Sequence, residues 1–70
     1  MVTFIETKPM NDGSFYVEVF CLSSDTKPST YNGKPISNGS VCIEQNGSTG
    51  AVGVYFRNAS NWKKVDNSGG

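Results

Sequence analysis

Residues 37–65 read SNGSVCIEQNGSTGAVGVYFRNASNWKKV and hold three short β-type segments separated by turn residues. Within it, residues 40–45 and 51–57 are rich in apolar side chains that alternate at period two, the spacing of a half-buried β-strand. The NGSTG sequence between these segments has the composition of a hairpin loop. A second turn, with the sequence NAS, leads into residues 61–65, which contain the only tryptophan. The stretch therefore predicts three consecutive β-strands.

The residues before this stretch predict two further strands and one long loop. Residues 2–7 and 14–22 are rich in β-branched and aromatic side chains, and an Asn-Asp-Gly turn lies between them. Pro9 cannot donate to a strand ladder, so we expect the first strand to end there or to lie on an edge. Residues 23–38 have no periodicity and contain two Lys-Pro dipeptides. The sequence predicts an all-β fold, a small antiparallel meander or partly open barrel of about five strands, with a long polar loop between strands two and three.

The alternation also predicts which side chains point into the core. In the second strand the wholly apolar set is Phe15, Val17, Val19 and Cys21. In the later strands the corresponding set is Val41, Ile43, Val52, Val54 and Phe56. The other face of the second strand places Glu18 between two aromatic residues, so we expect that face to be half-exposed or covered by a partner.

A chain of 70 residues with 36% apolar composition forms one domain at most. We assign residues 1–65 to a single small β domain and residues 66–70 to a flexible polar tail. A domain of this size buries only about 60% of its unfolded surface and usually needs a disulfide, a metal or a partner chain. The composition therefore favours self-association or docking on a larger assembly.

The charge pattern and the hydropathy pattern argue against two classes of partner. Six Lys and Arg balance six Asp and Glu, and the charges are scattered apart from Lys63-Lys64, so no basic patch for nucleic acid is evident. No apolar run reaches the roughly 18 residues of a membrane span. The N-terminus lacks the basic and apolar regions of a signal peptide. We expect no nucleic-acid partner, no membrane partner and synthesis in a cytoplasm.

Few side chains carry the chemistry that an enzyme needs. Histidine, the commonest general base and metal ligand, is absent. Cys21 and Cys42 lie in apolar segments, so we expect two buried thiols, and a disulfide stays open if their strands adjoin. Glu18 and Glu44 fall on predicted strands, but so short a chain offers no cleft for a glycosidase-like carboxylate pair. We predict no catalytic residue, no cofactor, no metal site and no enzymatic activity.

Aromatic side chains outside the predicted core are the remaining candidates for function. Tyr and Trp are enriched at the energetic centres of protein interfaces. Two interpretations stay open: these side chains form a protein or carbohydrate contact surface, or the sheet closes on itself and Trp62 caps the core. The candidate interaction surface comprises Tyr16, Phe20, Tyr31, Tyr55, Arg57 and Trp62.

Several short segments of the chain carry a resemblance to a known group of proteins. They are residues 22–28 (LSSDTKP), 36–40 (ISNGS), 43–44 (IE), 53–56 (GVYF) and then Trp62. In this order the chain resembles small proteins encoded among the virion structural genes of tailed bacteriophages and prophages of Gram-positive bacteria. The resemblance implies a phage gene product that is made in the host cytoplasm and assembled into the virion. It implies no catalytic residue.

The resemblance and the composition together favour one function over two alternatives. We expect a non-enzymatic virion accessory protein that docks on capsid or tail through protein–protein contacts, as a homo-oligomer or on those phage proteins. The first alternative is an early phage regulator that binds and inhibits a host or anti-phage defence protein. The second is a carbohydrate-binding module at the tail tip that uses Tyr55 and Trp62.

Overall fold

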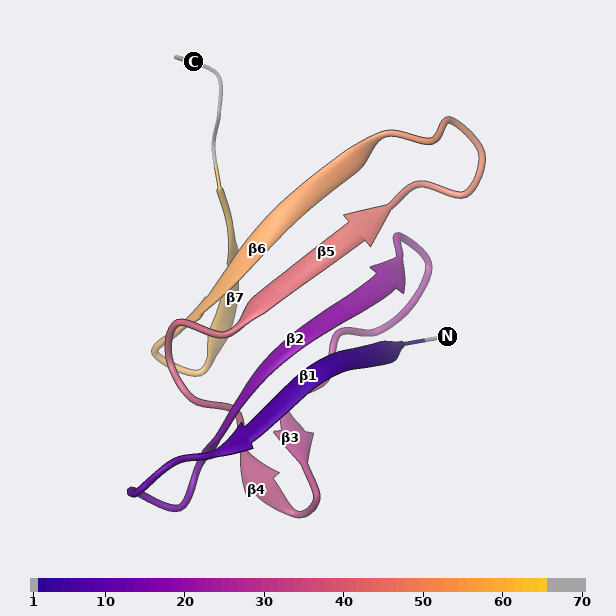
Figure 1. The fold of residues 1–70 in the computed structure, drawn as a ribbon. Helices are drawn as coiled ribbons and strands as arrows, with labels where there is room; N and C mark the ends of the chain where they lie inside the picture. The colour runs from indigo at the N-terminus through magenta and orange to yellow at the C-terminus, as the bar shows by residue number, and fades with distance from the viewer. Residues whose placement is uncertain (1, 66–70) are drawn as a thin grey trace.

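A computed structural model describes residues 2–65, so Met1 and the predicted polar tail, residues 66–70, lie outside the described residues. The described part of the chain is all-β, with seven strands and no helix (Figure 1), which confirms the predicted fold class. The strands are β1 (Thr3–Pro9), β2 (Phe15–Leu22), β3 (Thr30–Tyr31), β4 (Lys34–Pro35), β5 (Val41–Gln45), β6 (Val52–Asn58) and β7 (Asn61–Lys64).

Five of these strands form one sheet in the order β1-β2-β5-β6-β7. β1–β2, β5–β6 and β6–β7 are antiparallel neighbours, whereas β2 and β5 are parallel. The predicted antiparallel meander is therefore wrong at the centre of the sheet, and the sheet is open, with edges at β1 and β7, instead of a barrel. Parallel neighbours need a crossover, because the chain must return to the starting end of the sheet before the second strand begins.

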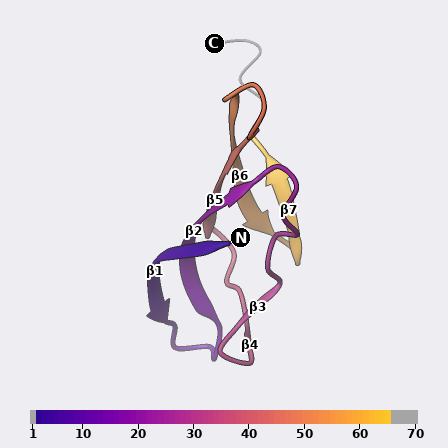
Figure 2. The same ribbon diagram turned by 90° about the vertical axis from the view of Figure 1, so that its right-hand side faces the viewer.

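Residues 23–40 make this return across one face of the sheet, which we call the covered face (Figure 2). The predicted polar loop contains a regular element, since β3 and β4 form a two-stranded hairpin. The hairpin turn, Asn32-Gly33, has φ values of 53° and 76°, the pair of positive angles that a two-residue type I′ turn needs. No described segment crosses the opposite face, which we call the open face (Figures 1 and 2).

The core lies between the covered face and this crossover. The buried apolar side chains are Val17, Val19, Cys21, Ile36 and Cys42. Ile36 comes from the crossover and forms an isolated bridge with Phe15 at the start of β2. Ser40 is fully buried as well, and its Oγ accepts a hydrogen bond from the Val17 N–H at 3.0 Å. None of the buried apolar side chains is larger than isoleucine, so the core is small.

The register of the sheet fixes which side chains lie on the covered face. Residues paired across neighbouring strands point to the same side of a sheet, and a slip of one residue reverses the face of a whole strand. Val19 pairs with Cys42, Cys42 with Tyr55, and Tyr55 with Lys64. Because Val19 is buried against the crossover, this entire row belongs to the covered face.

The predicted inward set is confirmed in β2 and is wrong in β5 and β6. Val17, Val19 and Cys21 are each 0% exposed. Val52 and Phe56, by contrast, are 64% and 43% exposed and lie on the open face. The side chains that were wrongly predicted to face inward are Val41, Ile43, Val52, Val54 and Phe56. The register reverses them, because the covered-face row places Cys42 and Tyr55 toward the core.

Both edges of the sheet carry features that discourage pairing with another strand. β1 has an irregular register between Phe4 and Glu6 and ends at Pro9, which has no N–H to donate. β7 has only four residues and carries Lys63 and Lys64. The expected edge positions of the first and last strands are confirmed. The faces of the sheet, and not its edges, are therefore the surfaces to examine for a partner.

Candidate functional site: the open face of the sheet

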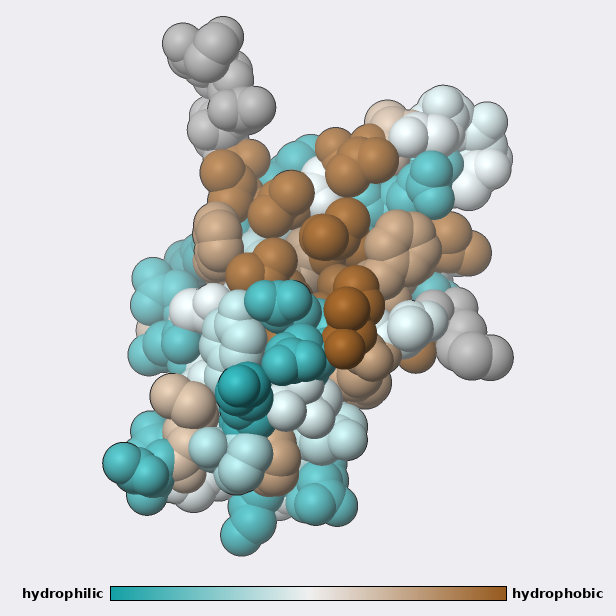
Figure 3. Space-filling view, viewed as in Figure 1, coloured by the Kyte–Doolittle hydropathy of each residue, from teal (hydrophilic) through white to brown (hydrophobic). Residues whose placement is uncertain are grey.

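Apolar side chains gather over β2, β5 and β6 on the open face, as the space-filling view shows (Figure 3). Phe56 is 43% exposed and Val52 64% exposed, although both have strand-forming side chains of the kind that normally pack. We call this surface the open-face patch. It consists of Phe20, Leu22, Val41, Ile43, Val52, Val54 and Phe56.

The register makes the open-face patch continuous across three strands. Phe20 pairs with Ile43, and Ile43 pairs with Val54, so these three side chains form one row across the sheet. Val41 pairs with Phe56 in the adjacent row. Paired side chains on one face of a sheet lie about 5 Å apart, which is contact distance for aliphatic and aromatic groups. The patch is therefore a contiguous apolar surface and not a set of scattered side chains.

Charged side chains of opposite sign lie at the two ends of one row through the patch. Glu6 pairs with Glu18 at the β1–β2 end, and Glu18 pairs with Val41 at the patch. At the other end, Phe56 pairs with Lys63 on β7. The order across the open face is thus acid, acid, apolar, apolar, base.

Tyr16 holds the Glu18 carboxylate at the acidic end of this row. The Tyr16 hydroxyl donates a hydrogen bond to Glu18 Oε2 at 2.9 Å, and this bond raises the pKa of Tyr16 above its usual value. Both residues belong to β2 and lie two positions apart, so they share the open face. The rim of the patch is therefore partly ordered before any partner binds.

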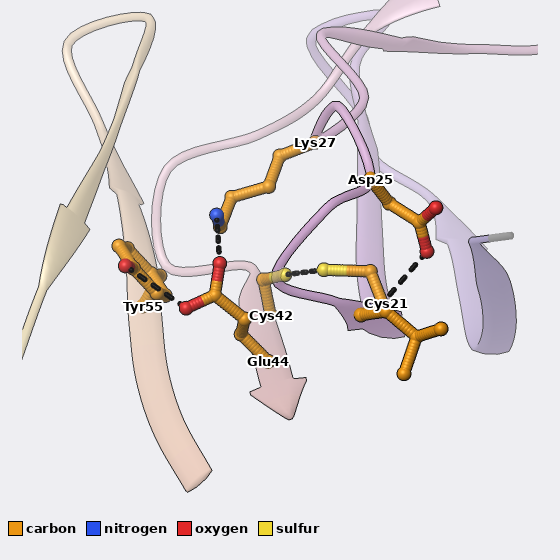
Figure 4. Close-up of polar contacts among 7 residues, drawn as sticks. Cys21, Asp25, Lys27, Cys42, Glu44 and Tyr55 are labelled. Atoms are coloured by element: carbon orange, nitrogen blue, oxygen red, sulfur yellow. Dashed lines mark hydrogen bonds and ion pairs between the residues drawn. The ribbon is translucent and has the colours of Figure 1, made fainter. Parts of the chain in front are cut away.

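On the covered face, a polar cluster ties the crossover to the sheet (Figure 4). Lys27, from the crossover, donates to Glu44 Oε2 at 2.8 Å, and its Nζ lies 4.2 Å from the centroid of the Tyr55 ring. The Tyr55 hydroxyl donates to Glu44 Oε1 at 3.3 Å. The hydrogen bond from Lys27 is the main cause that holds the pKa of Glu44 below its usual value. Both carboxylate oxygens of Glu44 are thus engaged in structural bonds.

The two cysteines lie side by side beneath this cluster. Their Sγ atoms are 3.5 Å apart, and both residues are buried and unbonded, as the sequence predicted for the thiols. Burial is the main cause that raises the pKa of Cys42 to about 12, followed by the hydrogen bond with Cys21. Cys21 pairs with Glu44 and Cys42 with Val19, so the cysteines are diagonal neighbours. Diagonal Cα atoms lie about 7–8 Å apart, which is at or beyond the usual span of a disulfide.

Arg57 and Trp62 lie on the covered face where β6 pairs with β7. Arg57 is only 8% exposed, and its guanidinium carbon lies 5.4 Å from the centroid of the Trp62 ring. The Trp62 indole N–H donates to the Pro28 carbonyl in the crossover at 2.8 Å. Trp62 packs against the core and fixes the crossover, so it caps the core as one interpretation held, although the sheet does not close on itself.

The six residues predicted for an interaction surface divide between the two faces. Tyr16 and Phe20 lie on the open face. The other four lie on the covered side, where Tyr31 contacts the rings of Phe4 and Phe15 at centroid distances of 4.7 and 5.2 Å. Those four are Tyr31, Tyr55, Arg57 and Trp62.

Sequence reasoning missed the apolar residues of β5 and β6 as surface candidates, because it placed them in the core. One signal was available in β2, where both alternating sets contain large apolar side chains. A strand with two apolar faces indicates a sheet that is covered on both sides. Only one of those two covers is present in the described chain.

Other kinds of site find little support among residues 2–65. No group of three or more His, Cys, Asp or Glu side chains there is placed to hold a metal ion. A hollow of the surface lies where the β1–β2 turn meets the end of the crossover, and its lining includes Asp12, Ser14 and Ser37. No helix in the described part of the chain is long and apolar enough to cross a membrane.

The fold and the patch define a class of protein, a small all-β sheet with one face covered by its own chain and the other face apolar and uncovered. Comparison of the chain with protein-family models, with curated protein sequences and with solved structures found no match.

Proposed function

We propose that this chain is a non-enzymatic assembly protein that works by packing the open face of its sheet against a protein surface. The observation that carries the proposal is the open-face patch. Phe56 and Val52 are 43% and 64% exposed there, while none of the buried apolar side chains is larger than isoleucine. Exposed contiguous apolar surface on a small soluble domain marks an interaction site, because burying it is the largest favourable term available.

The chemistry of the covered face supports a non-enzymatic function. Both oxygens of Glu44 accept hydrogen bonds, so this carboxylate is not available as a general base. The raised pKa of Cys42, about 12, keeps this thiol protonated at neutral pH, and the thiolate is the nucleophilic form. The polar groups that come together in this fold serve to hold the crossover on the sheet.

The resemblance to phage proteins supplies the setting of the proposal. We propose that the chain is a virion accessory protein of a tailed bacteriophage, made in the host cytoplasm and incorporated with capsid or tail. Particle assembly suits a small domain whose second sheet face needs a protein partner. An early regulator of a host or defence protein uses the same kind of surface, but its synthesis precedes that of capsid and tail proteins.

The proposal is tested by asking whether an intact open face is needed for the chain to enter particles. Phe56→Ser changes the patch, and Met10→Ser changes a side chain of similar exposure, 47%, in the β1–β2 turn. Mass spectrometry of purified particles is expected to find wild type and Met10→Ser but not Phe56→Ser. Absence of the wild-type chain from particles, or equal incorporation of all three, contradicts the proposal.

A further inference from the structure

We propose that the protein surface that covers the open face is a second copy of this chain, arranged face to face about a two-fold axis that runs parallel to the strands. This inference rests on the proposed function and names the partner. The assembled unit is then a two-sheet sandwich in which the two open-face patches form a second core. Sheets in such sandwiches pack about 10 Å apart with their strands roughly aligned.

The size of the molecule fits this arrangement. The described chain forms a slab of 38 × 28 × 17 Å, so its broad face is large compared with its thickness. A standard stable interface buries about 800 Å² of each partner, and a face of these dimensions provides an area of that order. A homodimer interface is also more apolar than the rest of a protein surface, as the open-face patch is.

The edges of the sheet are poor places for self-association, which leaves the face. β1 carries the register irregularity and Pro9, and β7 carries Lys63 and Lys64. A register irregularity, a proline and exposed lysines each discourage strand-to-strand pairing at an edge. The open-face patch lies between the two edges, on β2, β5 and β6.

The charged row selects one orientation of the second copy. Across the open face the order is Glu6, Glu18, Val41, Phe56, Lys63. A two-fold axis parallel to the strands reverses this order in the second copy, so that Val41 faces Val41 at the centre. Glu6 of each copy then lies over Lys63 of the other. The same rotation places Glu18 over Phe56, between the central Val41 pair and the outer Glu6–Lys63 pair, so that one ion pair lies at each edge of the apolar core.

The alternative two-fold axis, which runs across the strands, is disfavoured by the same residues. It keeps the order of the row and places each strand over its own copy. With the axis through this row, Glu6 and Glu18 then face the acids of the second copy, and Lys63 faces Lys63. Like charges opposed in this way are destabilising, whereas complementary charges set the register of an interface. The two arrangements therefore predict opposite responses to charge reversal.

Sedimentation equilibrium of the purified chain over the micromolar range tests the inference. The wild type and the control Lys34→Glu, a charge reversal on the exposed β4 strand, are expected to form dimers. Glu6→Lys alone and Lys63→Glu alone are each expected to weaken the dimer roughly tenfold or more, because both ion pairs become repulsive. The double variant, with both reversals in one chain, is expected to restore the pairs. An equal mixture of the two single variants is expected to restore them as well, because its heterodimers bring opposite charges together at both positions.

Three results overturn the inference. A wild type that stays monomeric at all concentrations excludes the second copy as the partner. Single reversals that leave the dimer unchanged exclude the strand-parallel axis. A double variant as weak as the single variants excludes the Glu6–Lys63 pairs. None of these outcomes decides the proposed function, which is judged by incorporation of the chain into particles, so the two failures are distinguishable.

Discussion

Glu44 and Cys42 lie next to each other on the covered face, and their surroundings push their protonation in opposite directions. The hydrogen bond from Lys27 favours the carboxylate of Glu44 and lowers its pKa. Burial favours the neutral thiol of Cys42 and raises its pKa to about 12. The carboxylate is engaged in structural bonds, and the thiol is protonated and enclosed. The bond between Lys27 and Glu44 attaches the crossover to the sheet.

The state of the thiols predicts slow alkylation of the folded protein. Because Cys21 and Cys42 are 0% exposed, and the pKa of Cys42 is about 12, we expect iodoacetamide to modify them at least roughly tenfold more slowly than an exposed thiol. The Met10→Cys variant supplies that exposed thiol in the same fold. Mass spectrometry of timed samples gives both rates, and equal rates at all three cysteines contradict the placement of the thiols.

The Lys27–Glu44 bond predicts a pH dependence of stability. The pKa of Glu44 is lower in the folded protein, so the stabilisation is present at neutral pH and is lost as the pH falls through the folded-state pKa, below the ordinary value of 4.5. Replacing the carboxylate in Glu44→Gln is expected to destabilise the protein at neutral pH and to reduce the loss of stability on acidification. Urea unfolding at neutral and acidic pH measures this, with the wild type as the reference. A Glu44→Gln variant with an unchanged acid profile contradicts the argument.

At the scale of the element, the strands differ in which of their two alternating sets of side chains faces the crossover. In β2 the wholly apolar set turns inward, as its composition predicts. In β6 the more apolar set turns outward, and Tyr55 and Arg57 turn inward. The crossover supplies the partners that make this favourable: Lys27 lies over Tyr55, and the Pro28 carbonyl accepts from Trp62, which in turn stacks near Arg57.

The reversed faces predict unequal effects for two chemically identical substitutions. Val19 is 0% exposed in the core, and Val52 is 64% exposed on the open face. Val19→Ala removes packed methyl groups and is expected to lower the free energy of unfolding by roughly 2–3 kcal/mol. Val52→Ala is expected to change it by less than about 0.5 kcal/mol in dilute solution, where the open face is uncovered. Urea unfolding followed by Trp62 fluorescence compares the two, and equal losses contradict the assignment of faces.

Some features of this fold depend on the local sequence, and others depend on contacts between distant segments. The positions of the strands of the main sheet follow from alternation and turn residues, such as Gly13 between β1 and β2 with its positive φ of 87°. The parallel pairing of β2 with β5 does not follow from the local sequence, because it depends on the path of residues 23–40. That one pairing fixes the faces of β5 and β6, so an error about it reverses every side chain there. The open-face patch was missed for this reason.

At the scale of the whole molecule, the sheet has apolar side chains on both faces, and the described chain covers only one of them. The described chain is a slab 17 Å thick, which is close to the thickness of a sheet with a single layer of chain packed on it. Small domains gain stability by association when their own cores are limited. The open-face patch and its charged ends provide a surface on which a second sheet can pack. The central claim is that this surface is buried in the working protein, against a second copy.

Thiol cross-linking at the proposed axis tests this claim most directly. Val41 is the midpoint of the charged row, so the strand-parallel two-fold axis brings the two Val41 side chains together. With Cys21 and Cys42 buried, the Val41→Cys variant is expected to be joined into a covalent dimer by a bifunctional thiol reagent whose spacer matches the roughly 10 Å between packed sheets, seen on a denaturing gel. Thr30→Cys, on the exposed part of the β3–β4 hairpin, is expected to stay monomeric. Cross-linking of Thr30→Cys as efficient as that of Val41→Cys, or none at Val41→Cys, contradicts the account.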